Sequence, residues 1–180
     1  MIKLIKIFAV LFIVVILAMI SIGIFAPQNT YLSRTQVIKS PVNVVWRQLT
    51  TIENYTSWHI QINKALLNKG DQLWEGATVR FYMKDYETSI FHEEHVTVLE
   101  ADKKLILERK GLNENPLLRD YRTSYNLKPL LDGTTEITIE ISYRPASFVT
   151  RIYNQFLLKS TIGNTCDKNL IALRDLIENS

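Results

Sequence analysis

The feature that most constrains this chain is an uncharged apolar run near the N-terminus. Residues 7–26, IFAVLFIVVILAMISIGIFA, contain no Asp, Glu, Lys or Arg. A helix of about twenty residues is long enough to cross a hydrocarbon core of about 30 Å. The run is apolar on every side, which is typical of a helix that faces lipid. We therefore predict a transmembrane anchor over residues 1–27, ended by Pro27.

Two other interpretations of this run fit the sequence less well. A buried core helix is disfavoured, because a domain of this size cannot surround a helix that is apolar all round. A cleaved signal peptide would share the basic start that Lys3 and Lys6 supply, but the run is long and shows no small-residue cleavage site. The other flank carries no charge before Arg34. The positive-inside rule then predicts a single-pass protein of the cell membrane, with a cytoplasmic N-terminus and an extracytoplasmic domain.

The charge of the rest of the chain is balanced. The 180 residues include 21 basic and 18 acidic ones, and without Lys3 and Lys6 the counts are 19 and 18. The basic residues are scattered, so we expect no nucleic-acid partner. A single cysteine, Cys166, excludes an internal disulfide and a zinc site built on several thiolates. We predict a short tether over residues 28–33 and one globular domain over residues 34–180.

The domain is expected to begin with a strand over residues 34–39 and two short helices. Ser40 and Pro41 are favoured at a helix start, as the N-cap and the first helical residue. One helical face then carries Val42, Val45, Trp46 and Leu49. The second, shorter helix ends near Trp58.

Several later segments are typical of strands. The clearest is residues 134–143, TTEITIEISY, which alternate apolar and polar residues, as residues 79–83 and 117–127 also do. Strands are also expected at residues 90–99, a long β-rich segment, and at residues 105–107, which are apolar. Turn residues separate them at Gly70–Asp71, Lys110–Gly111 and Asp132–Gly133. Successive strands with short turns predict an antiparallel meander with one dry face.

No proline interrupts residues 146–180, which predicts a long C-terminal helix. Its expected buried face consists of Val149, Ile152, Phe156, Ser160, Gly163, Cys166, Leu170, Leu173 and Ile177. The middle of this face, from Ser160 to Cys166, is small. Small residues there leave space between the helix and the sheet or allow close backbone packing, and the sequence leaves both alternatives open.

Four segments, in this order, resemble one superfamily. They are SPVNVVW (40–46), IENYTSWH (52–59), GDQLWEGATV (70–79) and DGTTEITIEISYRP (132–145). With the order of elements, they resemble the START/SRPBCC (helix-grip, birch-allergen-like) superfamily, in particular its polyketide cyclase/dehydrase-like branch. The resemblance implies an α+β helix-grip fold, with a curved antiparallel sheet around the long C-terminal helix. It also implies a cavity between them that binds a hydrophobic small molecule or lipid.

We expect ten residues to contact such a ligand. They are Trp58, Phe81, Met83, Arg119, Tyr121, Tyr125, Ile139, Phe156, Ser160 and Gly163. Arg119 shares an expected strand face with Tyr121 and Tyr125, so it would orient a polar head group if that face is inside. Alternatively, Arg119 lies at the rim with its stem packed. Core packing explains Trp58 as well as ligand contact does.

The sequence singles out no catalytic residue, metal ligand or cofactor. The run HEEH, residues 92–95, spaces its histidines three apart in an expected strand, which points them to opposite faces, so we expect a solvated segment. A cyclase- or dehydratase-like enzyme needs an acid–base pair inside the cavity, and none stands out. Non-catalytic binding is therefore favoured over that enzyme, and over a protein-interaction module with a filled core.

Overall fold

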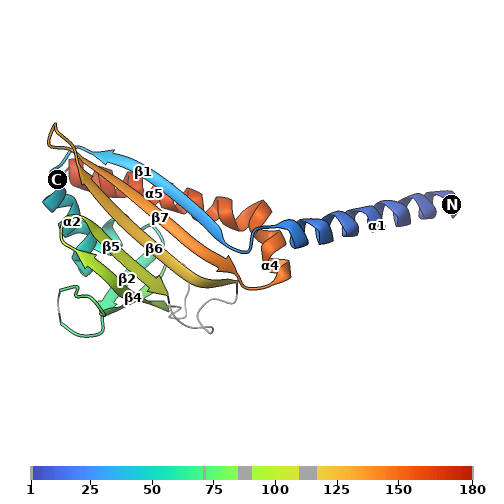
Figure 1. Cartoon of the computed structure of the whole chain (residues 1–180), viewed down its shortest axis with the longest axis horizontal. Helices are drawn as coiled ribbons and strands as arrows, with labels where there is room; N and C mark the ends of the chain where they lie inside the picture. Colours follow the sequence, from blue (N-terminus) through green and yellow to red (C-terminus); the bar gives the residue numbers. More distant parts are fainter. Residues whose placement is uncertain (1, 71, 85–90, 110–116, 180) are drawn as a thin grey trace.

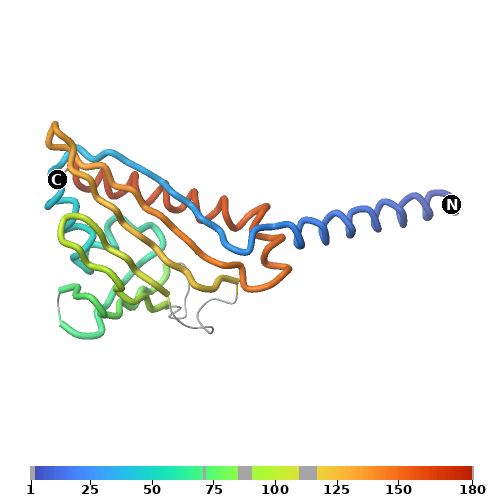
Figure 2. Tube along the Cα trace, viewed as in Figure 1, coloured from blue at the N-terminus to red at the C-terminus, as the bar shows by residue number. Residues whose placement is uncertain are grey.

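The computed structural model describes residues 2–70, 72–84, 91–109 and 117–179. One curved, seven-stranded antiparallel sheet packs against a long C-terminal helix, and an apolar helix projects from one end of this domain (Figure 1). Figure 2 shows the same arrangement as a trace, with the N-terminus far from the sheet and the C-terminus at the opposite end of the domain. The fold is the α+β helix-grip arrangement.

The projecting helix is α1 (Ile2–Phe25), which covers the apolar run. The segment Lys3–Phe25 is long and apolar enough to cross a membrane, and only 6% of its most apolar stretch is buried against the rest of the chain. This exposure argues against the core-helix alternative. Pro27 follows the helix, because a proline nitrogen cannot donate the next helical hydrogen bond.

The seven strands lie in the order β1-β7-β6-β5-β4-β3-β2, and every neighbouring pair is antiparallel. Their bounds are β1 Thr30–Ile38, β2 Ile62–Leu67, β3 Thr78–Met83, β4 Phe91–Glu100, β5 Lys104–Arg109, β6 Leu118–Pro129 and β7 Thr135–Pro145. The expected meander is confirmed, and β1 closes it by pairing with β7. Strand β2 was not expected, because INKALL does not alternate apolar and polar residues.

One expected strand begins earlier in the structure, and some expected features lie outside the described residues. Strand β1 starts at Thr30 rather than at residue 34, where Thr30 pairs with Tyr143. Ile90, Asp71 and the expected turn at Lys110–Gly111 lie outside the described residues. The turn at Asp132–Gly133 is present, with Gly133 at a φ of +79° that favours glycine.

The two short helices are α2 (Val42–Thr50) and α3 (Tyr55–Trp58), joined by the 3₁₀ turn η1 (Ile52–Asn54). Helix α2 begins one residue later than expected, with Pro41 rather than Ser40 at the N-cap position. Trp46 is half-buried against the core, whereas Trp58 is only 1% exposed. The second helix ends at Trp58, as predicted.

The C-terminal helix contains a π-helical segment. Helix α4 (Phe148–Tyr153) leads into η2 (Asn154–Leu158) and then α5 (Lys159–Glu178). The buried Asn154 accepts a hydrogen bond from the Tyr143 hydroxyl at 2.6 Å and donates one to Thr30 Oγ1 at 2.8 Å. These bonds join the start of the helix to the ends of β1 and β7.

The π-helical segment changes which side of the helix is buried. A π turn holds more residues than an α turn, so side chains before it are rotated relative to those after it. The expected single buried face is therefore wrong in its first half, where Val149 and Phe156 are 72% and 62% exposed. Ser160 is also exposed. In the second half, Leu170, Leu173 and Ile177 are buried as predicted.

The tightest part of the core lies at the end of the domain away from α1. Six side chains from the sheet, α2 and α5 have no exposed surface there: Ile38, Val45, Leu49, Leu105, Ile137 and Leu173. The other end of the same sheet is packed differently.

Candidate binding site

A cavity of about 470 Å³ lies between the inner face of the sheet and the first half of α5. Its lining includes Met83 at the end of β3, Phe91 at the start of β4 and Leu118 at the start of β6. These strand ends lie at the α1 end of the domain, because Leu118 pairs with Pro145 at the end of β7 and α1 leads into the start of β1. The volume is within the range of small-molecule sites.

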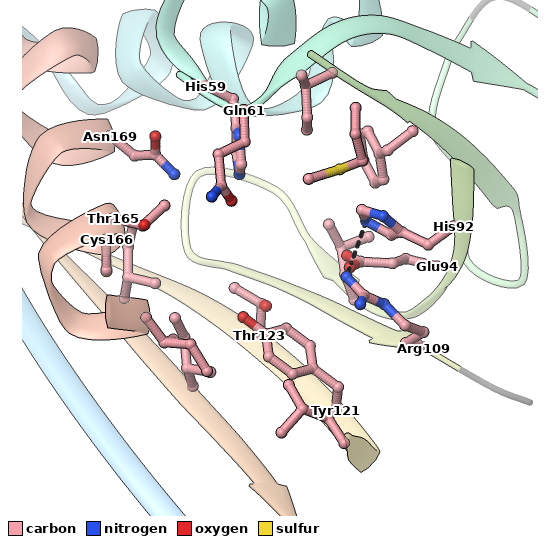
Figure 3. Close-up of a pocket in the computed structure, with 18 of the residues that line it drawn as sticks. His59, Gln61, His92, Glu94, Arg109, Tyr121, Thr123, Thr165, Cys166 and Asn169 are labelled. Atoms are coloured by element: carbon pink, nitrogen blue, oxygen red, sulfur yellow. Dashed lines mark hydrogen bonds and ion pairs between the residues drawn. The ribbon is translucent and has the colours of Figure 1, made fainter. Parts of the chain in front are cut away.

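Helix α5 contributes small and polar side chains to the cavity. Its lining residues are Thr161, Ile162, Thr165, Cys166 and Asn169, and Leu158 of η2 precedes them. Figure 3 shows Thr165, Cys166 and Asn169 on the opposite side of the cavity from the charged residues of the sheet. Burial raises the pKa of the Cys166 thiol to about 12, with a further contribution from Asp167, so this thiol stays protonated at neutral pH.

The sheet contributes a buried ion pair. Glu94 on β4 is 6% exposed and lies opposite Arg109 on β5. Arg109 Nη2 donates to Glu94 Oε1 at 3.0 Å, and Nε2 of His92 lies 3.2 Å from the same oxygen (Figure 3). The Arg109 guanidinium also lies over the Tyr121 ring, 4.8 Å from its centroid. The Glu94 carboxylate therefore has Arg109 and His92 as partners, and the Arg109 guanidinium has Glu94 and the Tyr121 ring.

Ionisation states follow from these surroundings. Burial alone would raise the pKa of Glu94, but the hydrogen bond with His92 and the charge of Arg109 outweigh it and lower the pKa to about 2. Burial lowers the pKa of His59 to about 4. Burial raises the pKa values of Tyr55 and Tyr121. At neutral pH, therefore, Glu94 is an anion, His59 is neutral and the phenols are protonated.

Three buried polar atoms of the cavity lining have no hydrogen-bond partner among the described residues. They are the Tyr55 hydroxyl, Nδ1 of His59 and Nε of Arg109. A buried polar group left without a partner costs about 1–3 kcal/mol. None of the three atoms has appreciable accessible surface, so they lie behind the surface of the cavity, whose wall combines apolar and polar side chains.

The structure brings together five of the ten residues predicted to contact a ligand. Phe81, Met83, Tyr121, Tyr125 and Ile139 line the cavity. Trp58 lies behind this wall, with its ring centroid 4.9 Å from that of Tyr55 and 6.3 Å from that of Tyr125. Arg119, Phe156, Ser160 and Gly163 lie elsewhere.

Arg119 is displaced by a bulge in β6. The register of β6 against β7 shifts between Arg119 and Arg122, and Asp120 has a φ of +51°. An extra residue in one strand exchanges the two faces beyond it. Leu118 therefore faces the cavity together with Tyr121, and Arg119 is exposed.

Gly163 allows close packing rather than leaving space. A Cβ at this position would lie 2.7 Å from Nη2 of Arg34, a residue of β1. Arg34 also pairs through Nε with Asp167, one turn further along α5, at 2.9 Å. Of the three small residues at the centre of the predicted face, only Cys166 lines the cavity.

Sequence reasoning missed the charged half of the site. The expected solvated segment is wrong for His92 and Glu94, which point inward, although His95 does lie on the opposite face and contacts Thr78 Oγ1 at 3.0 Å. The signal was present in the alternation, because His92 and Glu94 are in phase with the buried Val96. Within the part of the chain that the structure describes, no three His, Cys, Asp or Glu side chains are placed to hold a metal ion.

The fold and the cavity together define a helix-grip domain of the START type. The family model described as polyketide cyclase / dehydrase and lipid transport matches residues 30–178, and the chain belongs to this family. No curated protein matches the sequence.

Solved structures share the fold at low sequence identity. The Zhui aromatase/cyclase from Streptomyces sp. R1128 is 12% identical with a TM-score of 0.69, over 83% of this chain and 94% of that one. A START superfamily protein from Mycobacterium smegmatis is 13% identical with a TM-score of 0.61, over 83% of this chain and 97% of that one. An uncharacterised protein from Rhizobium leguminosarum is 16% identical with a TM-score of 0.63, over 84% of this chain and 96% of that one.

Proposed function

We propose that this chain is a membrane-anchored protein that binds an uncharged amphipathic molecule, without catalysis, in the cavity between the sheet and α5. The observation that carries the proposal is the cavity itself, whose wall combines apolar side chains with polar ones. A protein-interaction module with a filled core would have no such space. The family description and the START-type fold support a hydrophobic ligand.

The balance of charge in the cavity favours a ligand without charge. Glu94 and Arg109 neutralise each other, and His59 carries no proton at neutral pH. A carboxylate or phosphate on the ligand would be buried without a matching cation, which is strongly unfavourable. Carbonyl or hydroxyl oxygens, by contrast, can bond with polar side chains that line the cavity, such as Gln61 and Thr123. The ligand would place its polar end against these side chains.

The second part of the proposal concerns anchoring in the membrane. Helix α1 would cross the cell membrane, with Lys3 and Lys6 holding the N-terminus in the cytoplasm and residues 28–180 on the other side. Anchoring would keep the cavity close to ligands dissolved in the bilayer. Protease added to sealed vesicles tests this orientation, because only an exposed domain is digested.

Binding can be tested with three probes that share one hydrocarbon chain and differ in their head group, one charged and two neutral. A conjugated tetraene fatty acid, its methyl ester and its alcohol are added to the full chain in lipid nanodiscs, with empty nanodiscs as the blank. Trp58 packs against the cavity wall, so energy transfer from tryptophan to the tetraene reports a bound probe. We expect the ester and the alcohol to bind at least about tenfold more tightly than the acid.

A single substitution should reverse this preference. In Glu94→Gln, the Arg109 charge is no longer balanced, so the acid should gain affinity and the ester should not. The matched control is Glu93→Gln, the next residue on β4, whose carboxylate pairs with Arg80. If the acid and the ester bind equally in the wild-type protein, the ligand is not selected for neutrality. If no probe binds, the binding function itself is wrong.

A second candidate function is a cyclase- or dehydratase-like reaction in the same cavity. The observation in its favour is the contact of His92 with Glu94, since an imidazole oriented by a carboxylate can act as a general base. The ionised Glu94 would orient such a base without itself exchanging a proton. Mass spectrometry of molecules extracted from wild-type and His92→Gln protein separates the two functions. A dehydratase predicts bound species that differ by one water, whereas a binding protein predicts identical species.

A further inference from the structure

The α1 end of the domain carries an exposed apolar surface outside the cavity. Helix α4 and the π-helical segment η2 expose their large apolar side chains, and Phe25 at the end of α1 is exposed beside them. The fractions exposed are Phe25 85%, Val149 72%, Phe156 62%, Leu157 53%, Tyr153 42% and Phe148 36%. We call these six residues the α4 surface. A contiguous apolar surface of this kind marks an interaction site on a folded domain.

The position of this surface relative to α1 is fixed by packing. Figure 1 shows α4 lying across the axis of α1 at the end of the domain. Gly23, in the last turn of α1, packs directly on the Phe148 ring of α4, and a side chain at that position would collide with it. The α4 surface therefore lies at the level where the apolar helix ends.

The segment that carries this surface is basic, although Arg144 at its start pairs with Asp120 of β6 at 2.7 Å. Between Glu140 and Asp167 the sequence contains Arg144, Arg151 and Lys159 and no acidic residue. The Arg151 guanidinium lies 5.6 Å from the centroid of the Phe148 ring, at the edge of the surface. Basic residues flanking exposed apolar and aromatic ones are typical of segments that lie in the interface of a membrane with anionic lipids.

We propose that the α4 surface inserts into the boundary between head groups and acyl chains of the bilayer that α1 crosses. This inference rests on the membrane part of the proposed function but not on the ligand. The surface also adjoins the cavity, because Leu157 belongs to the surface and the next residue, Leu158, lines the cavity. A molecule dissolved in the bilayer would then reach the cavity without crossing bulk water.

Nitroxide labels test this placement in the full chain. In a Cys166→Ser background, single cysteines are introduced as Val149→Cys or Phe156→Cys and labelled in liposomes that contain anionic lipid. The control is Leu131→Cys, which is fully exposed in the turn between β6 and β7 at the far end of the domain. Circular dichroism of each labelled protein verifies that the fold is retained.

We expect the labels at 149 and 156 to collide mainly with oxygen, which concentrates in the bilayer, and the label at 131 to collide mainly with a water-soluble nickel chelate. Collision with nickel at all three positions would overturn the inference. Protection of 149 and 156 from both reagents would also overturn it, because a second protein would then cover the surface. If α1 itself does not enter the liposomes, which flotation detects, the membrane part of the proposed function fails.

Discussion

The two ends of the helix-grip domain are built from the same sheet and the same helix but are packed in opposite ways. Away from α1, Leu173 of α5 belongs to one core cluster with Ile38 and Leu105, and none of the three has exposed surface. Towards α1, Thr161 and Thr165 of α5 face Tyr121 and leave a cavity. The first half of α5 presents Thr161, Thr165 and Cys166 where the second half presents Leu170 and Leu173. A decrease in side-chain size along one helix therefore accompanies the change from packed core to cavity.

The largest expected effect of a substitution is at the closed end. Leu173→Ala removes a fully buried side chain from close-packed surroundings, and we expect a loss of about 2–5 kcal/mol in the free energy of unfolding. Chemical denaturation measures it, with Ile171→Ala, which is 44% exposed on the same helix, as the control. A loss at Leu173 no larger than that at Ile171 would mean that the closed end is not the main source of stability.

An intermediate effect is expected from acid at the open end. The pKa of His59 in the folded protein, about 4, is below the ordinary value of 6.5, so the unfolded chain takes up the proton first as the pH falls. The contribution of His59 to the free energy of unfolding is fully present above pH 6.5 and is lost progressively from pH 6.5 to 4. Between pH 7.5 and 5 this loss is about 2 kcal/mol. The contribution of Glu94 is lost only below pH 4.5.

His59→Gln should remove this acid sensitivity, because glutamine has no proton to gain. The melting temperature of both proteins is measured from pH 7.5 to 5, with His95→Gln on the outer face of β4 as the control. If the melting temperatures of the wild-type protein and His59→Gln fall in parallel as the pH is lowered, His59 is not the group responsible for the loss of stability in acid.

The smallest effect on stability, and a large one on binding, is expected from filling the cavity. Thr165→Leu places a larger apolar side chain into existing space, so we expect stability to change by no more than about 1 kcal/mol. Binding of the tetraene ester should fall at least about tenfold, because ligand and side chain compete for the same volume. Unchanged affinity would place the ligand outside this cavity.

Local patterns predicted the elements of the fold, whereas single-residue irregularities decided the site. Alternation identified β3, β6 and β7, because their inner faces are largely apolar, whereas β4 was expected from its β-rich composition. The bulge beside Asp120 and the π-helical segment each change the direction of the side chains on one side of the irregularity relative to those on the other side. The spacing of apolar residues in the sequence indicates neither irregularity. Arg119 and Phe156 were predicted to contact a ligand for this reason.

The charged residues of the cavity were missed for a different reason. Glu94 and Arg109 come from separate strands, and each looks solvated until pairing places them opposite one another. A polar residue in phase with apolar neighbours on a strand, such as Glu94 two positions before Val96, is the pattern that would have indicated a buried partner.

The connection between α1 and β1 has a mechanical consequence. It consists of residues 26–29, which reach about 14 Å even when fully extended. Ala26 shortens this reach further, because its N–H still bonds to the carbonyl of Ile22 at 2.8 Å. With α1 in a bilayer, the domain would be unable to travel from one membrane to another as a soluble shuttle does. It would exchange cargo with the single leaflet beneath it, and any delivery elsewhere would require a second protein to come to that leaflet.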